Sequence, residues 1–130
     1  MWRGPFDNAE VNALHAEAFH HDPFEDDWVA LTQAHSMGWV TARHDGRLVG
    51  FANVIWDGLV HAWLQDVIVA ESERRTGVGL ALVVVARDQA KHAGCEWLHV
   101  DFDEDLAPFY LGAAGFTRTA AGLINLSESD

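Results

Sequence analysis

A basic, glycine-containing turn joins a predicted strand to a predicted helix and has the composition of an anion-binding site. The strand ends in Val67, Ile68 and Val69, which are β-branched and suit a buried strand. The first amides of the helix lack partners within it and lie at the positive end of its dipole, so they bind anions. Glycines let a phosphate approach such amides closely. The turn and the first helical residues are Arg74, Arg75, Thr76, Gly77, Val78, Gly79 and Leu80.

The anion in this turn is predicted to be a nucleotide pyrophosphate. The turn lacks the lysine of a Walker loop, and Leu82 occupies the place of the third glycine of a dinucleotide fingerprint. ATP and NAD are therefore disfavoured.

A second segment, residues 109–116, contains Tyr110, the only tyrosine of the chain. It reads Phe-Tyr-Leu-Gly-Ala-Ala-Gly-Phe, and it is separated from the basic turn by a predicted helix and a predicted strand. The Arg74-x-x-Gly77-x-Gly79 spacing together with this segment resembles the two signatures of the GNAT superfamily of acyl-CoA-dependent N-acetyltransferases. The resemblance covers roughly residues 45–126, and the amino-terminal third only in outline.

The resemblance implies an α/β fold with a mixed, mostly antiparallel, splayed sheet flanked by about four helices, and acetyl-CoA as co-substrate without a metal. It implies that the pyrophosphate lies on the amides of residues 74–80. The pantetheine arm would pair with the main chain of Val67 and Val69, and an amide near Val67 or Ile68 would hold the oxyanion. Tyr110 matches the family's usual proton donor to the departing thiolate. The alternative for Tyr110 is a buried aromatic whose hydroxyl is satisfied structurally.

Asp66 is an unusual residue for a central strand. Carboxylates are rare there, because an unpaired buried charge is costly in free energy. Trp63 occupies the position at which many relatives carry a glutamate base, so that role cannot be transferred. Asp66 instead matches an acidic residue of family members that act on small cationic amines. It could bind an ammonium group, relay its proton through water, or make a structural hydrogen bond.

Histidines offer weaker signals. His61 shares a strand face with Trp63 by alternation and suits proton relay near neutral pH, although a structural role is the commoner one. The run His20-His21-Asp22 at a helix end is not expected to converge on one metal ion. His92 and His99 are predicted to be structural.

Composition is typical of a small enzyme. The 130 residues are expected to form one domain, residues 1–130, and the net charge of −12 disfavours nucleic-acid binding. Two interpretations of the negative charge stay open: it keeps the protein soluble, or its field attracts a cationic amine. No apolar stretch is long enough to span a membrane, and the start of the chain lacks a signal peptide, so a cytoplasmic location is expected. Cys95 is the only cysteine and is predicted to be a structural thiol.

Hydrophobic spacing and turn residues predict the order of elements. Helices are expected at residues 8–19, 25–35, 78–93 and 106–114, the first opened by an Asp7–Glu10 capping box. Strands are expected at residues 39–44, 47–55, 61–69, 97–102, 116–119 and 123–126, with a short first strand possible around Trp2 and Arg3.

The predicted function is transfer of an acetyl group from acetyl-CoA to a primary amine, in the first instance a small cationic amine, by direct attack in a ternary complex. A covalent acyl-enzyme is disfavoured because the predicted centre has no cysteine. Two alternatives stay open: a peptide or protein N-acetyltransferase, and a non-catalytic acyl-CoA-binding module. By family analogy a homodimer is expected, with the last strands as its surface.

Overall fold

Two tight turns arrange the first three strands as an antiparallel sheet in the computed structural model, which describes residues 1–127. Asp45 (φ 51°) and Gly46 (φ 79°) reverse the chain between β1 and β2. Asp57 accepts the backbone N–H of Leu59 at 2.7 Å in the next turn. The strands are β1 (Ser36–His44), β2 (Arg47–Trp56), β3 (His61–Val69) and β4 (Trp97–Val100).

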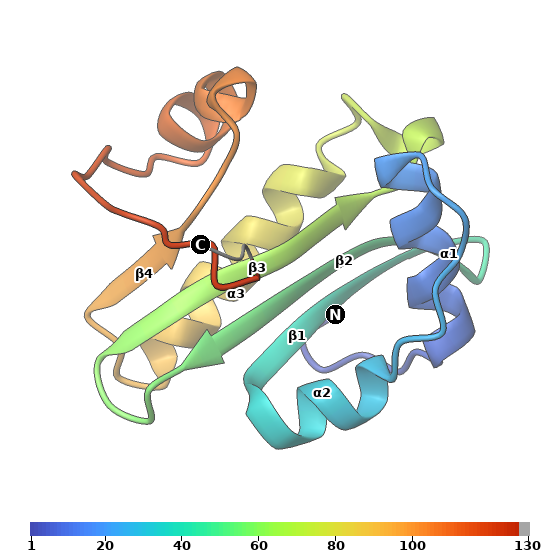
Figure 1. Ribbon diagram of the computed structural model, residues 1–130, viewed down its shortest axis with the longest axis horizontal. Helices are drawn as coiled ribbons and strands as arrows, with labels where there is room; N and C mark the ends of the chain where they lie inside the picture. The colour runs from blue at the N-terminus through green and yellow to red at the C-terminus, as the bar shows by residue number, and fades with distance from the viewer. Residues whose placement is uncertain (128–130) are drawn as a thin grey trace.

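The sheet is mixed and has the order β1-β2-β3-β4, with only β3 and β4 parallel (Figure 1). The parallel pair requires a crossover, which α3 (Val78–His92) provides. This architecture confirms the predicted α/β class, with a mostly antiparallel, open sheet and flanking helices. Among residues 1–127, no helix is long and apolar enough to cross a membrane.

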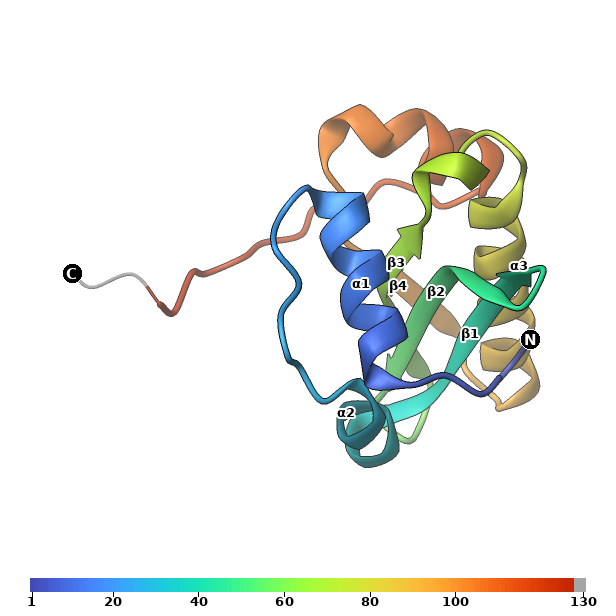
Figure 2. The ribbon, with the colours of Figure 1, turned by 90° about the vertical axis from the view of Figure 1, so that its right-hand side faces the viewer.

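Helices cover both faces of the sheet (Figure 2). On one face, Leu82, Val83 and Ala86 of α3 pack in a core with apolar residues of the strands such as Val54 and Leu64. On the other face lie α1 (Asn8–Phe19) and α2 (Trp28–His35). Their core residues are Val11, Leu14 and Trp28, which pack with Leu48, Val49, Phe51, Ile68 and Ala70.

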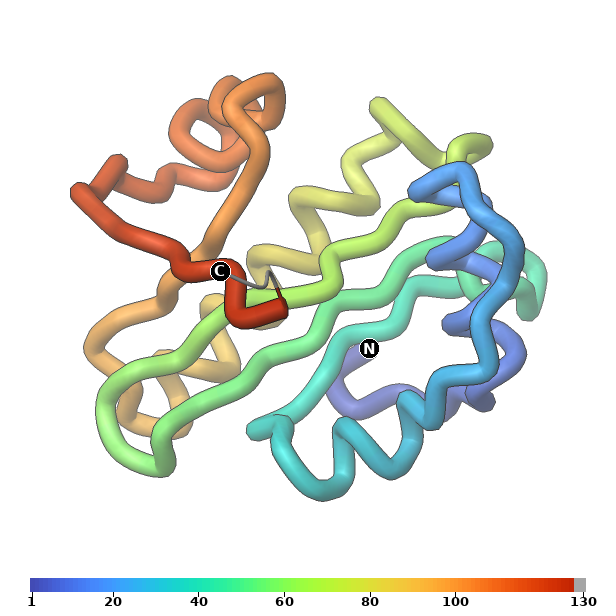
Figure 3. Tube along the Cα trace, viewed as in Figure 1, coloured from blue at the N-terminus to red at the C-terminus, as the bar shows by residue number. Residues whose placement is uncertain are grey.

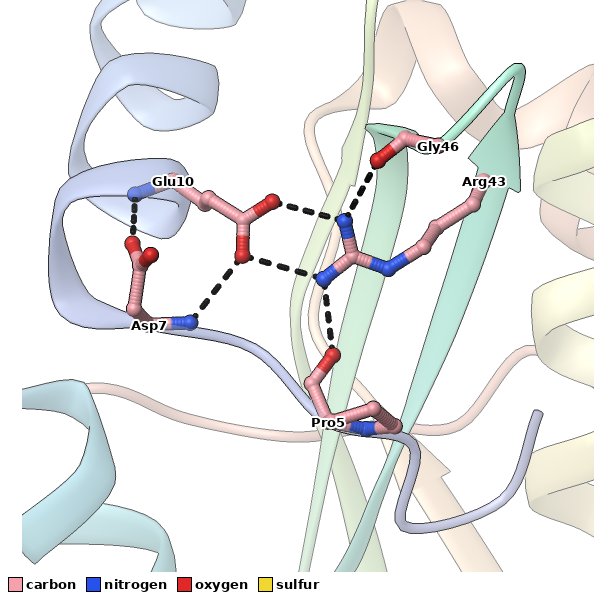
Figure 4. Close-up of polar contacts among 5 residues, drawn as sticks. All are labelled: Pro5, Asp7, Glu10, Arg43 and Gly46. Atoms are coloured by element: carbon pink, nitrogen blue, oxygen red, sulfur yellow. Dashed lines mark hydrogen bonds and ion pairs between the residues drawn. The ribbon is translucent and has the colours of Figure 1, made fainter.

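An ion pair ties the start of α1 to the β1–β2 hairpin (Figure 4). The predicted capping box is present: Asp7 accepts the N–H of Glu10 at 2.8 Å, and Glu10 accepts the N–H of Asp7 at 3.1 Å. Arg43 donates to both carboxylate oxygens of Glu10, at 2.6 and 3.0 Å, and to the carbonyls of Pro5 and Gly46. This network fixes the position of α1 over the sheet.

The structure differs from the prediction at three places in the amino-terminal third. β1 begins at Ser36, not at residue 39. The second helix begins at Trp28 rather than at residue 25, because Asp27 caps it by accepting the N–H of Ala30 at 3.0 Å. The short first strand is a single bridge between Trp2 and Val40.

The prediction was also wrong about the carboxyl-terminal region. β4 ends at Val100, and the predicted helix is a short 3₁₀ turn (Glu104–Leu106) followed by a π-helical segment (Pro108–Ala113). Residues 116–126 form no strand (Figure 3). Phe116 still packs against Tyr110, and the later part of the segment extends away from the body of the protein (Figure 2). Leu123, Ile124 and Leu126 are 94%, 81% and 91% exposed, so the predicted strand pair buries no apolar face that could stabilise it.

Candidate active site

A fork opens between β3 and β4 and exposes part of the β3 backbone. The parallel pairing runs only from His61–Trp97 to Leu64–Val100, whereas β3 continues to Val69. Beyond Val100 the chain diverges from β3 (Figure 1).

Backbone direction decides which β3 groups face the fork. The N–H of Ala70 donates to Val49 of β2 at 2.8 Å. Because main-chain groups alternate sides along an antiparallel strand, Ile68 also directs its N–H and C=O toward β2. The main-chain groups of Val67 and Val69 therefore face the fork. Ile68 differs from its neighbours, since its side chain is also buried in the core under α1.

A β-bulge lies at the fork and carries Asp66. Phe51 pairs with Ile68 and Asn53 pairs with Gln65, so Asp66 and Val67 together face the single residue Ala52. Asp66 has a left-handed φ of 54°. Bulges of this kind re-aim a side chain.

The Asp66 carboxyl is half-buried on the α1 side of the sheet. Burial raises its pKa, while the Asn53 amide and the charge of His15 oppose that shift. Asn53 is fully buried; its Oδ1 accepts the Ser36 hydroxyl at 2.5 Å, and its Nδ2 makes no hydrogen bond within residues 1–127. An amide donor and a carboxylate therefore lie together beside the fork.

His15 of α1 belongs to the same group. Burial lowers its pKa, the neighbouring His21 adds to that effect, and Asp66 and Asp26 act in the opposite direction. The Nδ1 of His15 lies 2.6 Å from the Nε2 of His21. Sequence reasoning missed His15 and Asn53, although Asn53 interrupts the apolar run of a central strand and could have been noticed.

The basic turn presents unpaired amides at the start of α3. Gly77 (φ 90°) precedes the helix, and apart from its chain neighbours no heavy atom of residues 1–127 lies within 4 Å of the position that its Cβ would occupy. The amides of Arg74 and Thr76 already donate to Glu71 and Glu73 at 3.3 Å. The amides that make no hydrogen bond within the described chain are those of Arg75, Gly77, Val78, Gly79 and Leu80.

The arginine side chains of the turn differ in their surroundings. Arg74 donates to the carbonyl of Ala18 near the end of α1, at 3.2 Å, and lies 4.0 Å from Glu71. It thus links the turn to α1. Arg75 has a left-handed φ of 66°, and its side chain makes no hydrogen bond or ion pair within residues 1–127.

Gly79 brings the two signature segments together. A Cβ at this position would lie 3.5 Å from Phe109 and 3.7 Å from Val69, which is ordinary van der Waals contact. The first turn of α3, the end of β3 and the π-helical segment therefore meet at the open end of the fork.

Tyr110 is buried on the β4 side of the fork within an aromatic cluster. Its ring stacks on Phe102 with centroids 5.0 Å apart and meets the edges of Phe109 and Phe116 at 4.9 and 6.0 Å. Burial raises the pKa of the phenol, so the hydroxyl carries its proton at neutral pH. Its hydroxyl makes no hydrogen bond with another residue of the described chain and is free to donate to a ligand.

Comparison with known proteins identifies the family. The acetyltransferase (GNAT) family matches residues 7–116, which is most of the chain. The chain belongs to the GNAT acetyltransferase family. No curated protein matches it at a significant level.

Solved structures share the GNAT fold along nearly the whole chain. A probable acetyltransferase from Staphylococcus aureus is 20% identical, with a TM-score of 0.75 over 98% of this chain and 100% of the other. A GNAT family acetyltransferase from Streptococcus pneumoniae is 23% identical, with a TM-score of 0.73 over 98% and 97%. AAC(6')-Iy, in complex with the bisubstrate analogue CoA-S-monomethyl-acetylneamine, is 19% identical, with a TM-score of 0.72 over 92% and 90%.

The donor that the GNAT family uses, acetyl-CoA, fits the residues present. Unpaired amides at a helix start suit a pyrophosphate, and the open space beside Gly77 leaves them accessible. Outward-facing main-chain groups on β3 suit the amides of a pantetheine arm.

The environment of Asp66 leads to a prediction about stability. Because the folded pKa lies above the ordinary value of 3.8, the unfolded state binds fewer protons between the two values, and stability falls as pH rises through that window. Asp66→Asn removes the charge, and asparagine tolerates a left-handed φ. We expect the variant to unfold at a higher temperature than wild type at pH 7, and the difference to vanish in acid.

Asp45→Asn is the matched control, because Asp45 also has a left-handed φ and its side chain is 95% exposed. This variant should leave the melting temperature unchanged. A lower melting temperature for Asp66→Asn alone would mean that the carboxylate makes a structural hydrogen bond.

Proposed function

We propose that the protein transfers the acetyl group of acetyl-CoA to a primary amine, specifically a small cationic amine, by direct attack in a ternary complex. The observation that carries this proposal is the half-buried carboxylate of Asp66 on a β-bulge beside the fork. A carboxylate at that cost to stability is best explained by a cationic ligand that pairs with it.

Other features support a cationic acceptor. The net charge of −12 creates a field that attracts cations to the surface. The AAC(6')-Iy structure, which has the same fold, holds an analogue in which CoA is joined to an acetylated neamine.

Acetyl-CoA would be held by backbone groups of two elements. The amides of Arg75 and of residues 77–80 would bind the pyrophosphate, and the main chain of Val67 and Val69 would pair with the pantetheine arm. The side chain of Arg75 is available for a phosphate, whereas that of Arg74 holds α1. When bound, acetyl-CoA supplies the thioester from which the acetyl group is transferred.

The remaining chemistry falls to two groups. The Val67 amide, which faces the fork, would stabilise the oxyanion. Tyr110 would give its proton to the departing thiolate, since its phenol is protonated at neutral pH and its hydroxyl is free. Asp66 would bind the ammonium form of the acceptor and orient it.

We also propose a cytoplasmic homodimer. Cys95 is the only cysteine in the sequence, so no internal disulfide can form, which fits a reducing compartment. The exposed apolar residues Leu123, Ile124 and Leu126 support burial of the carboxyl-terminal segment against a second copy.

Binding of acetyl-CoA is the first test. At a hundredfold excess over its dissociation constant, acetyl-CoA should stabilise the fold by about 2.7 kcal/mol, seen as a rise in melting temperature. Gly79→Leu should abolish this rise, because its side chain would enter the space near Val69 and Phe109. The control Gly122→Leu, in the open carboxyl-terminal segment, should keep it. No shift with any acyl-CoA would refute the proposed donor.

Tyr110→Phe tests the proton donor. The variant keeps the ring and its stacking, so acetyl-CoA affinity and melting temperature should not change. Turnover should fall by about 10²- to 10⁴-fold, the usual contribution of general-acid catalysis. Steady-state kinetics under conditions where chemistry limits turnover measure this. An unchanged kcat would assign Tyr110 to packing.

An amine panel tests the acceptor class. Polyamines, aminoglycosides, amino acids and arylamines are compared by release of CoA, and cationic amines should be preferred. Their KM should rise with salt, because charges in solvent are screened beyond about 10 Å at 0.1 M ionic strength. Asp66→Asn should raise this KM or lower kcat, and Asp45→Asn should not. A preference for neutral or anionic acceptors, without an effect of salt on KM, would refute the cationic acceptor. Binding of acetyl-CoA without turnover of any amine would instead indicate a non-catalytic acyl-CoA-binding module.

A further inference from the structure

Two histidines from neighbouring strands form a hydrogen-bonded pair at the base of the fork. The Nδ1 of His61 on β3 lies 2.9 Å from the Nε2 of His99 on β4. The indole of Trp63 stacks on both imidazoles, with centroids 5.0 Å from His99 and 6.0 Å from His61. Two imidazoles joined in this way can pass a proton from one ring to the other.

The two imidazoles lie on the same face of the sheet as the Asp66 side chain. Ala62 and Leu64 are buried in the core under α3, so the alternation of β3 places His61 and Trp63 on the opposite face. On β4, Leu98 and Val100 pack against that same core, which places His99 on the α1 face. Asp66, which interacts with His15 of α1, lies on this face too.

The register of β3 against β4 shows which of the two histidines lies nearer the fork. His99 is opposite Trp63, one position before the fork opens after Leu64 and Val100. His61 lies two residues farther from the fork. Its backbone N–H donates to the Asp57 carboxylate in the β2–β3 turn at 3.2 Å. His99 is thus the ring nearer the reaction centre, and His61 is the ring nearer the loop.

We propose that His99 and His61 form a two-imidazole relay that removes the proton of the acceptor ammonium and delivers it to solvent. The inference rests on the proposed acetyltransferase function and supplies the base that Trp63, in the place of the usual glutamate, cannot be. Asp66 binds and orients the ammonium, and His99 accepts its proton.

The protons and bonds balance. The ammonium gives one proton to Nδ1 of His99, the proton on Nε2 of His99 passes to Nδ1 of His61, and His61 releases a proton from its own Nε2 to water. The freed amine forms a bond to the acetyl carbon as the carbon–sulfur bond breaks. Tyr110 gives its proton to the departing thiolate, and the second proton that leaves the nitrogen passes to the Tyr110 phenolate and restores the phenol. One ammonium and one acetyl-CoA thus yield one amide, one CoA thiol and one proton in solution.

The test combines substitution with chemical rescue, using acetyl-CoA and the amine of the panel that the wild type acetylates fastest. His99→Ala should lower kcat by about 10²-fold, and added imidazole should restore part of it, because His99 is exposed and a free imidazole can occupy its place. His61→Ala should cause a smaller loss, since His99 still accepts the proton. His92→Ala, an exposed histidine at the end of α3, should match wild type with and without imidazole.

A measurement without substrate tests the pair itself. In protein labelled with ¹⁵N-histidine, His99→Ala should move the ring ¹⁵N signals of His61 and leave those of His92 in place. The acetyl-CoA-induced rise in melting temperature should be the same in His99→Ala and wild type.

The outcomes separate the relay from the proposed function. A wild-type kcat in His99→Ala, or a loss that imidazole does not rescue, would overturn the relay, and acetylation by the wild type would still stand. Wild-type protein that acetylates no amine would refute the proposed function and the relay with it.

Discussion

The architecture of the candidate site depends on one constraint: β3 and β4 pair only at one end. The parallel ladder ends at Leu64 and Val100, while antiparallel hydrogen bonds to β2 carry β3 on to Val69. The unpaired stretch of β3 therefore offers main-chain donors and acceptors at an edge within the fold. Buried or bound backbone groups need partners, so such an edge is a place for a ligand that can act as a strand.

The bulge at Asp66 links this edge to the face of the sheet that α1 covers. An extra residue in β3 turns Asp66 out of the strict alternation and toward α1, where Asn53 and His15 lie. The arrangement is costly, because it combines a left-handed backbone with a half-buried carboxylate. The two apolar cores on either face make that cost tolerable, since they hold α1 and α3 in place independently of the bulge.

Sequence reasoning was most accurate where local signals were strong and least accurate where an element needed a distant partner. The capping box at Asp7 was predicted and confirmed, because it depends on neighbouring residues. The strands predicted at residues 116–119 and 123–126 were wrong. Phe116 packs against the aromatic cluster, but Leu123, Ile124 and Leu126 stay exposed, and residue types alone cannot reveal whether a strand finds a surface to pack on.

The sequence by itself determined the family, predicted an anion site at residues 74–80 and named Tyr110 as the single candidate phenol, because each rests on residues close together in the chain. Only the tertiary structure decided that Ile68, named with Val67 as a candidate for the oxyanion amide, directs its main chain toward β2 and away from the fork. It alone brought His15 and Asn53 to Asp66, and His99 to His61. These groupings join residues that are distant in sequence, and they arise from strand register and helix packing, which no local pattern specifies.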